Sequence, residues 1–241
     1  MFIPRVYYPH SLTLGAHLSA DKLLYHYLVH VLRLQKGDAV ILFNQEGGEY
    51  RAQLLNQNAK TLTLEIVEFI EVNRESPLTL HLGQGLARGD RMDFIIQKAT
   101  ELGVHTITPL FTQKCAVKLD ARRLEGRQQH WEKIAIHACE QCGRTQPPLI
   151  YPPLKLNDWL NQAFSGHSIF LQPGKGLSLK QFSSNGAFRL AIGPESGWEK
   201  NEIALFEDHH FIAASLGPRI LRTETASLTA ISILQALYGD L

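Results

Sequence analysis

The chain has few cysteines, few methionines and almost no net charge, and each shortage narrows what the protein can be. Its 241 residues include 3 cysteines and 2 methionines, and the formal net charge at pH 7 is +1. An odd number of cysteines without framework spacing argues against a disulfide-stabilised secreted protein, so we expect a reducing compartment. Global charge gives no sign of a nucleic-acid binder, and any basic surface must be local.

Long hydrophobic runs are also missing. No apolar run approaches the roughly 20 residues that a membrane-spanning helix needs. The segment Met1–Tyr8 lacks the charged-then-apolar layout of a signal peptide. With 44% hydrophobic and 20% charged residues, the composition is that of an ordinary globular protein with one large domain or two smaller ones. We therefore expect a cytoplasmic protein.

Residues 1–72 have the pattern of a small β-rich domain. Apolar residues at helical spacing predict one helix over Lys22–Arg33, with Ser19 and Asp21 as candidate caps. The turn Gln45–Gly48 predicts a hairpin. Strands are expected at Arg5–Tyr8, Ala39–Asn44, Glu49–Leu55 and Thr61–Val72. Several short strands with one helix suggest a small barrel.

The polar segment at residues 73–77 ends in a proline and predicts a linker between this domain and a second one at residues 78–241. In the second domain, strands and helices alternate, which predicts an α/β fold with a parallel sheet. Expected strands are Leu78–Leu86, Val104–Leu110, Ser168–Leu171, Arg189–Ile192 and Phe211–Ser215. Expected helices are Arg91–Leu102, Asp120–Gly143, Asn157–Phe164, Lys200–Asp208 and Thr223–Tyr238. By itself this pattern indicates an unknotted Rossmann-like sheet, whose ligands bind beyond the carboxyl ends of the strands.

Two glycine-containing turns follow such strand ends, and the first is Ile192-Gly-Pro-Glu-Ser-Gly197. Its glycines let the backbone approach a ligand closely, and exposed N–H and C=O groups can bind the edge of a flat heterocycle. A plain strand–helix connection is the alternative. The turn is not G-x-G-x-x-G and lacks the Lys-Ser/Thr of a phosphate loop, so a nucleoside triphosphate is disfavoured.

The second turn, Leu216-Gly-Pro-Arg-Ile-Leu-Arg222, leads directly into the last predicted helix. Glu224 gains there from the helix dipole, and Arg222 is close enough to pair with it or to bind a phosphate. An exposed cap with solvated charges is the alternative. The apolar Ile220 and Leu221 are unusual in a turn unless they wall a pocket, so we predict a cofactor site built from both turns.

A possible metal or redox motif, His137-x-Cys139-x₂-Cys142, is weaker than it looks. No second Cys-x-x-Cys pair completes a structural zinc site, and His137 and Cys139 fall on different faces of the predicted helix. We expect no metal, and interpret these as small residues that pack a core or a dimer contact.

Together the motifs resemble the SPOUT class of RNA methyltransferases and, most closely, the RsmE family. The resemblance covers essentially the whole chain, and its longest motif is Leu216-Gly-x-Arg-Ile-Leu-Arg-x-Glu-Thr-Ala226. One departure is Ser196, where the family usually has glycine. The other matching pieces are Arg5, His30–Arg33, Lys36–Asp38, Ile96–Val104, Trp131 with Ile134, Gln141 with Arg144, and Ile192–Glu195.

The resemblance implies more than the pattern does. It implies a C-terminal trefoil knot that binds bent S-adenosylmethionine, an N-terminal PUA-like barrel that binds RNA, and a homodimer. The implied reaction is methylation of N3 of a uridine in the 16S rRNA of the small ribosomal subunit. The implied cofactor-binding residues are Leu171, Gln172, Gly174, Ile192, Gly193, Pro194, Glu195, Gly197, Leu216, Gly217, Ile220, Leu221, Arg222, Thr225 and Ala226.

For catalysis, the N3 proton must be lost before or during attack, so the site must favour the deprotonated imide. Arg222 is the candidate for stabilising the developing anion, and Glu224 or Glu195 for accepting the proton, although either glutamate is equally suited to a structural role.

RNA binding requires local positive charge because phosphates dominate the affinity. The Arg122–Arg123 pair and Arg127 suit a solvated helix face better. The candidates are Arg5, Arg33, Arg88, Arg91, Lys98 and Arg144.

Two other functions stay open at this point. One is a methyltransferase of the same class that acts on another base position or on a ribose hydroxyl. The other is a non-catalytic RNA-binding protein with a vestigial pocket, which would not bind S-adenosylmethionine.

Overall fold

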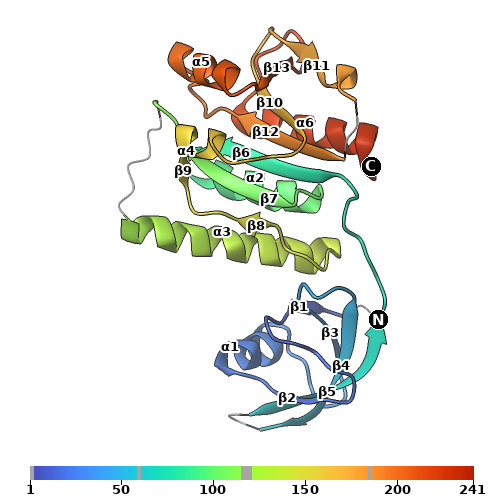
Figure 1. Cartoon of the computed structure of the whole chain (residues 1–241). Coiled ribbons are helices and arrows are strands. Elements are labelled where there is room, and N and C mark those ends of the chain that lie inside the picture. The colour runs from blue at the N-terminus through green and yellow to red at the C-terminus, as the bar shows by residue number, and fades with distance from the viewer. Residues whose placement is uncertain (1–2, 59–60, 115–120, 184–185) are drawn as a thin grey trace. The chain divides into compact units, whose positions relative to one another are not determined.

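The computed structural model describes residues 3–58, 61–114, 121–183 and 186–241 (Figure 1). The chain divides into two compact units. The first comprises Met1–Glu75 with Cys139–Pro147, and the second comprises Ser76–Ala138 with Pro148–Leu241. The predicted division at residues 73–77 did not include the return of Cys139–Pro147 to the first unit. None of the helices in the described ranges combines the length and apolar character needed to cross a membrane.

The first unit is built on a five-stranded sheet with the order β1-β3-β4-β5-β2. Strands β1 and β3 are parallel, and the other neighbours are antiparallel. One face packs apolar side chains such as Val40, Leu54 and Leu64 against Leu24 and Leu28. The strands are β1 (Arg5–Tyr7), β2 (His17–Ser19), β3 (Ala39–Phe43), β4 (Glu49–Gln57) and β5 (Leu62–Ile70).

The helix of this unit differs from the single α-helix expected over Lys22–Arg33. Asp21 caps α1 (Lys22–Tyr25) by accepting a hydrogen bond from the Leu24 N–H at 2.7 Å. The chain then widens into a π-helix, η1 (His26–Val31), where the Leu32 N–H donates to the Tyr27 carbonyl at 2.9 Å. Hydrophobic spacing alone cannot separate these two helix types, since an apolar face can be buried by either.

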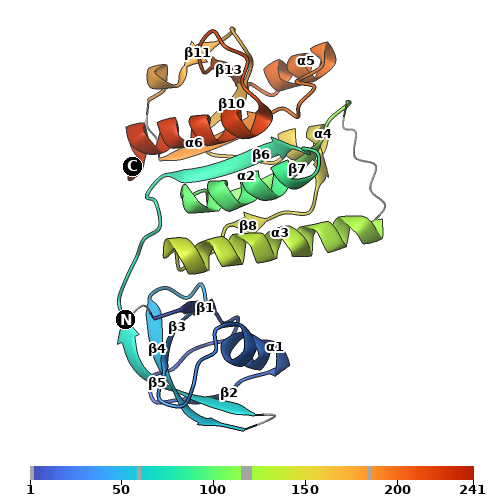
Figure 2. The same ribbon diagram turned by 180° about the vertical axis from the view of Figure 1, so that it is seen from behind.

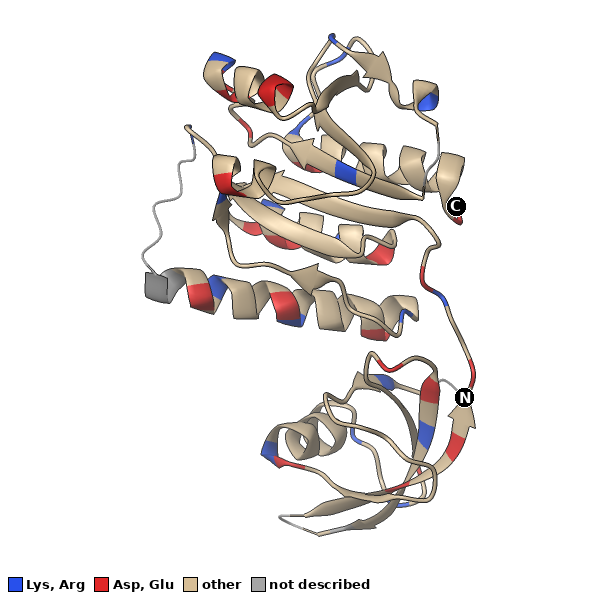
Figure 3. Ribbon diagram, viewed as in Figure 1, with Lys and Arg blue, Asp and Glu red and all other residues tan. Residues whose placement is uncertain are grey.

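The second unit is an α/β domain with eight strands in its described residues, in the order β11-β13-β10-β12-β6-β7-β8, with β9 beside β7. Each recorded pairing is parallel, which confirms the predicted sheet type. The strands are β6 (Thr79–Gly85), β7 (Thr106–Phe111), β8 (Leu149–Ile150), β9 (Leu154–Lys155), β10 (His167–Leu171), β11 (Leu177–Ser178), β12 (Ala187–Ile192) and β13 (Ile212–Ser215). Figure 3 shows that few residues of these strands are charged, as expected for a sheet buried on both faces.

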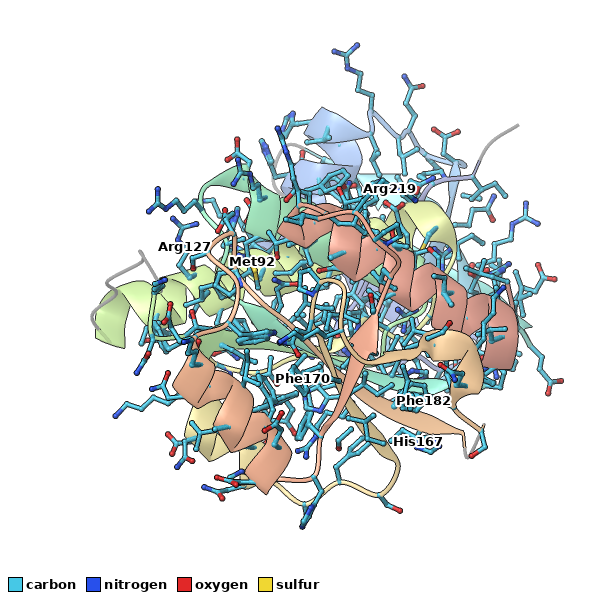
Figure 4. All side chains as sticks on the ribbon, turned by 90° about the horizontal axis from the view of Figure 1, so that it is seen from above. Met92, Arg127, His167, Phe170, Phe182 and Arg219 are labelled. Atoms are coloured by element: carbon cyan, nitrogen blue, oxygen red, sulfur yellow. The ribbon has the colours of Figure 1, made fainter. Side chains whose placement is uncertain are left out.

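Helices cover both faces of this sheet. On one face α2 packs against α6, as Figure 2 shows, and on the other α4 and α5 form a smaller core. Met92 and Phe170, labelled in Figure 4, belong to these two cores respectively. The helices are α2 (Asp90–Glu101), α3 (Ala121–Cys142), α4 (Leu156–Leu160), α5 (Lys200–Asp208) and α6 (Thr223–Tyr238), with a 3₁₀ turn η2 (Leu179–Gln181).

The bounds of α5 and α6 agree with the sequence prediction, but α4 ends at Leu160 and not at Phe164. The strands β2, β8, β9 and β11 were not predicted. Each has only two or three residues, too few for alternation to show in the sequence.

Candidate cofactor and RNA site

Three strand ends of the second unit surround a cavity of about 570 Å³. The segment after β10 forms one side, the turn after β12 forms a second, and the start of α6 with the segment before it forms a third. We call it the main cavity. Its lining residues are Arg91, Leu171, Pro173, Ile192, Gly193, Pro194, Glu195, Ser196, Gly197, Trp198, Ile220, Leu221, Arg222, Thr223 and Ala226.

A second cavity of about 50 Å³ shares Leu171, Pro173, Leu221 and Ala226 with the main cavity. It adds Gln172, Leu216, Gly217 and the exposed Arg219, which Figure 4 labels. Most of the predicted cofactor-binding residues therefore line one of these two cavities. Gly174 and Thr225 line neither. Sequence reasoning did not include Arg91, Pro173, Ser196, Thr223 or Arg219 in the cofactor set.

The turn after β12 is held in shape by its glycine and by a close neighbour. Gly197 has φ +68°, and its N–H donates to the Pro194 carbonyl at 2.9 Å. A Cβ on Gly85 would lie 2.6 Å from Pro194, so only glycine lets β6 approach this turn. Ser196 is not among the residues with positive φ, and it replaces glycine without backbone strain.

A buried polar network joins this turn to the start of α6. The Gln84 side chain donates to Thr223 Oγ1 at 3.0 Å and accepts from Ser227 Oγ at 2.6 Å. Thr223 Oγ1 in turn donates to the Gly193 carbonyl at 2.6 Å. Gln84 and Ser227 are fully buried, so these bonds fix two walls of the main cavity relative to each other.

Trp198 has two roles. Its indole N–H donates to the Leu171 carbonyl at 3.1 Å, and its ring packs edge-on against Phe206 at 4.7 Å between centroids. It also lines the main cavity. The residue thus connects the segment after β10 with the turn after β12.

The carboxylate of Glu195, which lines the main cavity, is bound by Arg91. Its Oε1 accepts from the Arg91 guanidinium at 2.7 Å and from the Arg88 backbone N–H at 3.1 Å. Burial alone would raise the pKa of Glu195, but these donors outweigh burial, and the pKa is lowered. A carboxylate with a lowered pKa is a weaker proton acceptor, which favours the structural alternative for this residue.

Arg222 and Glu224, the other two catalytic candidates, occupy different surroundings. Arg222 precedes α6 in an extended conformation and lines the main cavity. Within the described residues, it forms no ion pair with Glu224 or with any other carboxylate. Glu224 lines neither cavity, and its buried Oε2 has no hydrogen-bond partner among the described residues. The geometry therefore places Arg222, but not Glu224, beside the cavity.

The RNA-binding candidates of the first unit are not equivalent. Arg5 pairs with Glu49 and donates to the carbonyls of Glu140, Gly143 and Arg144, which close the C-terminal end of α3. The Arg144 side chain is only 5% exposed, and it pairs with Glu75 at 2.7 Å. Neighbouring backbone carbonyls and carboxylates thus occupy donors of both Arg5 and Arg144, and contact of these residues with RNA phosphates stays a prediction.

Other basic candidates remain at the surface. Arg33 is exposed, with φ +56°. In the second unit Arg88 is exposed, and Lys98 is partly neutralised by Glu101 at 2.8 Å. The side chains of Arg122 and Arg123 lie outside the described residues.

The cysteines give no sign of metal chemistry in the described part of the chain. No group of three His, Cys, Asp or Glu residues there is arranged to hold a metal ion. Cys139 is buried and Cys142 is half-buried, and neither forms a disulfide with another described residue. A hydrogen bond with Cys142 and burial raise the pKa of Cys139, so its thiol is a poor nucleophile.

Comparison with known proteins identifies the class. A family model of the RNA methyltransferase domain matches residues 74–235, and a model of the RNA methyltransferase PUA domain matches residues 24–67. The chain belongs to the RNA methyltransferase family, and the resemblance drawn from its motifs is confirmed.

Relatives match most or all of the chain. The chain is 37% identical to ribosomal RNA small subunit methyltransferase E of Buchnera aphidicola from Schizaphis graminum, covering 99% of this chain and 98% of that protein. The Bacillus subtilis enzyme of the same name is 31% identical, with 89% and 90% covered. The crystal structure of the Neisseria gonorrhoeae enzyme of that name, bound to S-adenosylmethionine, superposes with a TM-score of 0.93 at 33% identity, covering 100% of both chains.

Proposed function

We propose that this protein transfers a methyl group from S-adenosylmethionine to N3 of a uridine in the 16S rRNA of the small ribosomal subunit. The main cavity carries the proposal. It lies at three adjacent strand ends in a chain whose relative with the same fold was crystallised with S-adenosylmethionine. The name of the relatives supports small-subunit rRNA as the substrate.

The residues present fit this cofactor. The main cavity, at about 570 Å³, is within the range of small-molecule sites. Its walls combine apolar side chains, such as Ile192, Leu221 and Ala226, with backbone around Gly193 and Gly197. Apolar walls suit an adenosine ring, and backbone N–H and C=O groups suit its polar edges.

Bound S-adenosylmethionine would supply an electrophilic methyl group on a sulfonium. The uridine N3 must lose its proton before or during attack on that methyl carbon, while the carbon–sulfur bond breaks. Arg222, a cation without an ion pair among the described residues, is placed to stabilise the negative charge that develops on the imide. Glu195 is held by Arg91 and Glu224 lines neither cavity, so the N3 proton passes to solvent water in this proposal and not to a glutamate.

We further propose the arrangement that the family resemblance implies. The C-terminal segment forms a trefoil knot around the cofactor, residues 1–72 form the PUA-like RNA-binding domain, and the protein works as a cytoplasmic homodimer. The parallel sheet and the match to the PUA domain of RNA methyltransferases support this part of the proposal.

Mass-spectrometric mapping of rRNA tests the function. A strain that lacks the gene should lack one methyl group in 16S rRNA, and purified protein with S-adenosylmethionine should restore it to N3 of one uridine. Restoration at another atom, or no restoration on either free rRNA or small subunits, would contradict the proposal. A variant with Gly217→Val should fail to restore it, because Gly217 has φ +101°, a conformation that valine strongly disfavours.

A further inference from the structure

A third cavity, of about 240 Å³, adjoins the main cavity. Arg91, Pro194, Glu195 and Ser196 line both. We call it the cationic pocket, and the residues that line it alone are Leu86, Arg88 and Lys114. We propose that the cationic pocket binds a backbone phosphate of the RNA strand that carries the target nucleotide. The inference deepens the proposed function and rests on it.

The charges of the pocket favour an anion. Arg88, Arg91 and Lys114 line it, and their carboxylate partners are Glu195 for Arg91 and Glu199 for Lys114. Arg88 forms no ion pair with any residue that the structure describes. Arg88 is exposed, and the three cations exceed the two carboxylates, so the cluster keeps an excess of positive charge. A phosphate is the anion that RNA brings at every nucleotide.

Hydrogen-bond donors of the cationic pocket already bind one negatively charged oxygen, that of the Glu195 carboxylate. Oε1 of Glu195 accepts from the backbone N–H of Arg88 at 3.1 Å and from the Arg91 guanidinium at 2.7 Å. Backbone N–H groups and guanidinium groups are also the donors that bind phosphate oxygens. Because Glu195 uses only the N–H of Arg88, the Arg88 side chain stays available for a second anion. Lys114 is paired with Glu199, but its ammonium has three N–H donors and can bind an anion in addition.

The position of the pocket identifies the source of the phosphate. Arg88 and Lys114 do not line the main cavity, so their charges lie outside the cofactor site across the wall formed by Glu195 and Ser196. An acceptor base must enter the main cavity to reach the methyl group, and its backbone then lies beside that wall. Among the residues that the structure describes, those that line the cationic pocket include no aromatic ring to stack a base, which favours the backbone over an unpaired base.

Arg88→Ala in the full-length protein tests the inference. The change removes the guanidinium but keeps the N–H that holds Glu195. RNA affinity should fall roughly tenfold, and the slope of log affinity against log salt should become shallower by about 1. Lys114→Ala should act in the same direction, and Arg88→Lys should keep the salt slope. The matched control is Lys180→Ala, which removes an exposed cation that lines none of the cavities and should leave affinity and slope unchanged.

Calorimetry with S-adenosylmethionine separates the two possible anions. Unchanged cofactor affinity in Arg88→Ala supports an RNA phosphate, whereas a tenfold loss would assign the pocket to the cofactor carboxylate and overturn the inference. Equal RNA affinities and salt slopes for Arg88→Ala and Lys180→Ala would also overturn it. Failure of the proposed function is distinguishable, because wild-type protein would then bind RNA with the Arg88-dependent slope but place no methyl group on uridine N3.

Discussion

Glu195 and Arg222 flank the same cavity but use their charges differently. The carboxylate of Glu195 is neutralised by Arg91 and bound by the Arg88 N–H, so it fixes the turn after β12. Arg222 has no ion pair among the described residues and faces the cavity. A charge that the folded protein leaves uncompensated beside a ligand site is the one available to act on the ligand.

Arg222→Ala should lower the single-turnover rate about a hundredfold at saturating cofactor, the scale seen when one donor to a developing anion is removed. Arg222→Lys should retain part of the rate. Raising the pH should restore part of the Ala variant's rate, because more of the imide is then already deprotonated. Rapid-quench measurement of methylated uridine checks this prediction, and a wild-type rate in Arg222→Ala would exclude the role.

At the scale of elements, the site depends on contacts between strand ends and the last helix. Gln84 is a buried residue near the end of β6, and its side chain bonds to α6 at Thr223 and Ser227. Nothing in the sequence marks this glutamine, because a polar residue near the end of a predicted strand is ordinary. Its importance comes from the tertiary arrangement, in which β6 lies beside β12 and beneath the start of α6.

Gln84→Glu should destabilise the second unit by roughly 3 kcal/mol, since it buries a charge and removes the donor to Thr223. Gln84→Met should cost about 1 kcal/mol, because it leaves buried polar groups without one partner. Both variants should bind S-adenosylmethionine several-fold more weakly, through movement of Gly193 and Thr223. Urea unfolding measures the loss of stability, and calorimetry with S-adenosylmethionine measures the loss of cofactor affinity.

The exposed Gln162→Glu serves as the control for charge and should change stability by less than about 0.5 kcal/mol. If Gln84→Glu and Gln162→Glu had the same free energy of unfolding and the same affinity for S-adenosylmethionine, the hydrogen-bond network of Gln84 would contribute nothing to the site.

At the scale of the whole molecule, the main cavity belongs to the second unit alone. S-adenosylmethionine at about 100 times its dissociation constant should therefore stabilise this unit by about 2.7 kcal/mol. Hydrogen exchange should slow in peptides from β10, β12 and α6, and stay unchanged in β3, β4 and β5 of the first unit. Protection of the first unit to the same degree would show that the units respond together.

The sequence by itself determined the class of fold, the family and the two turns of the site. Alternating apolar segments are enough to predict a parallel α/β sheet, and the long motif at residues 216–226 is specific enough to indicate the family. Local preference also sets the ends of α5 and α6, so these were predicted to the residue.

Only the tertiary structure decided which charged residues are free to act. The sequence does not distinguish the four arginines Arg5, Arg88, Arg144 and Arg222 from one another. Folding brings Glu49 and the end of α3 to Arg5, and Glu75 to Arg144, but it leaves Arg222 at a cavity and Arg88 at a surface pocket. The partners of Arg5 and Arg144 lie far away in the chain, so no local pattern predicts them, and the availability of a charge depends on what the fold places beside it.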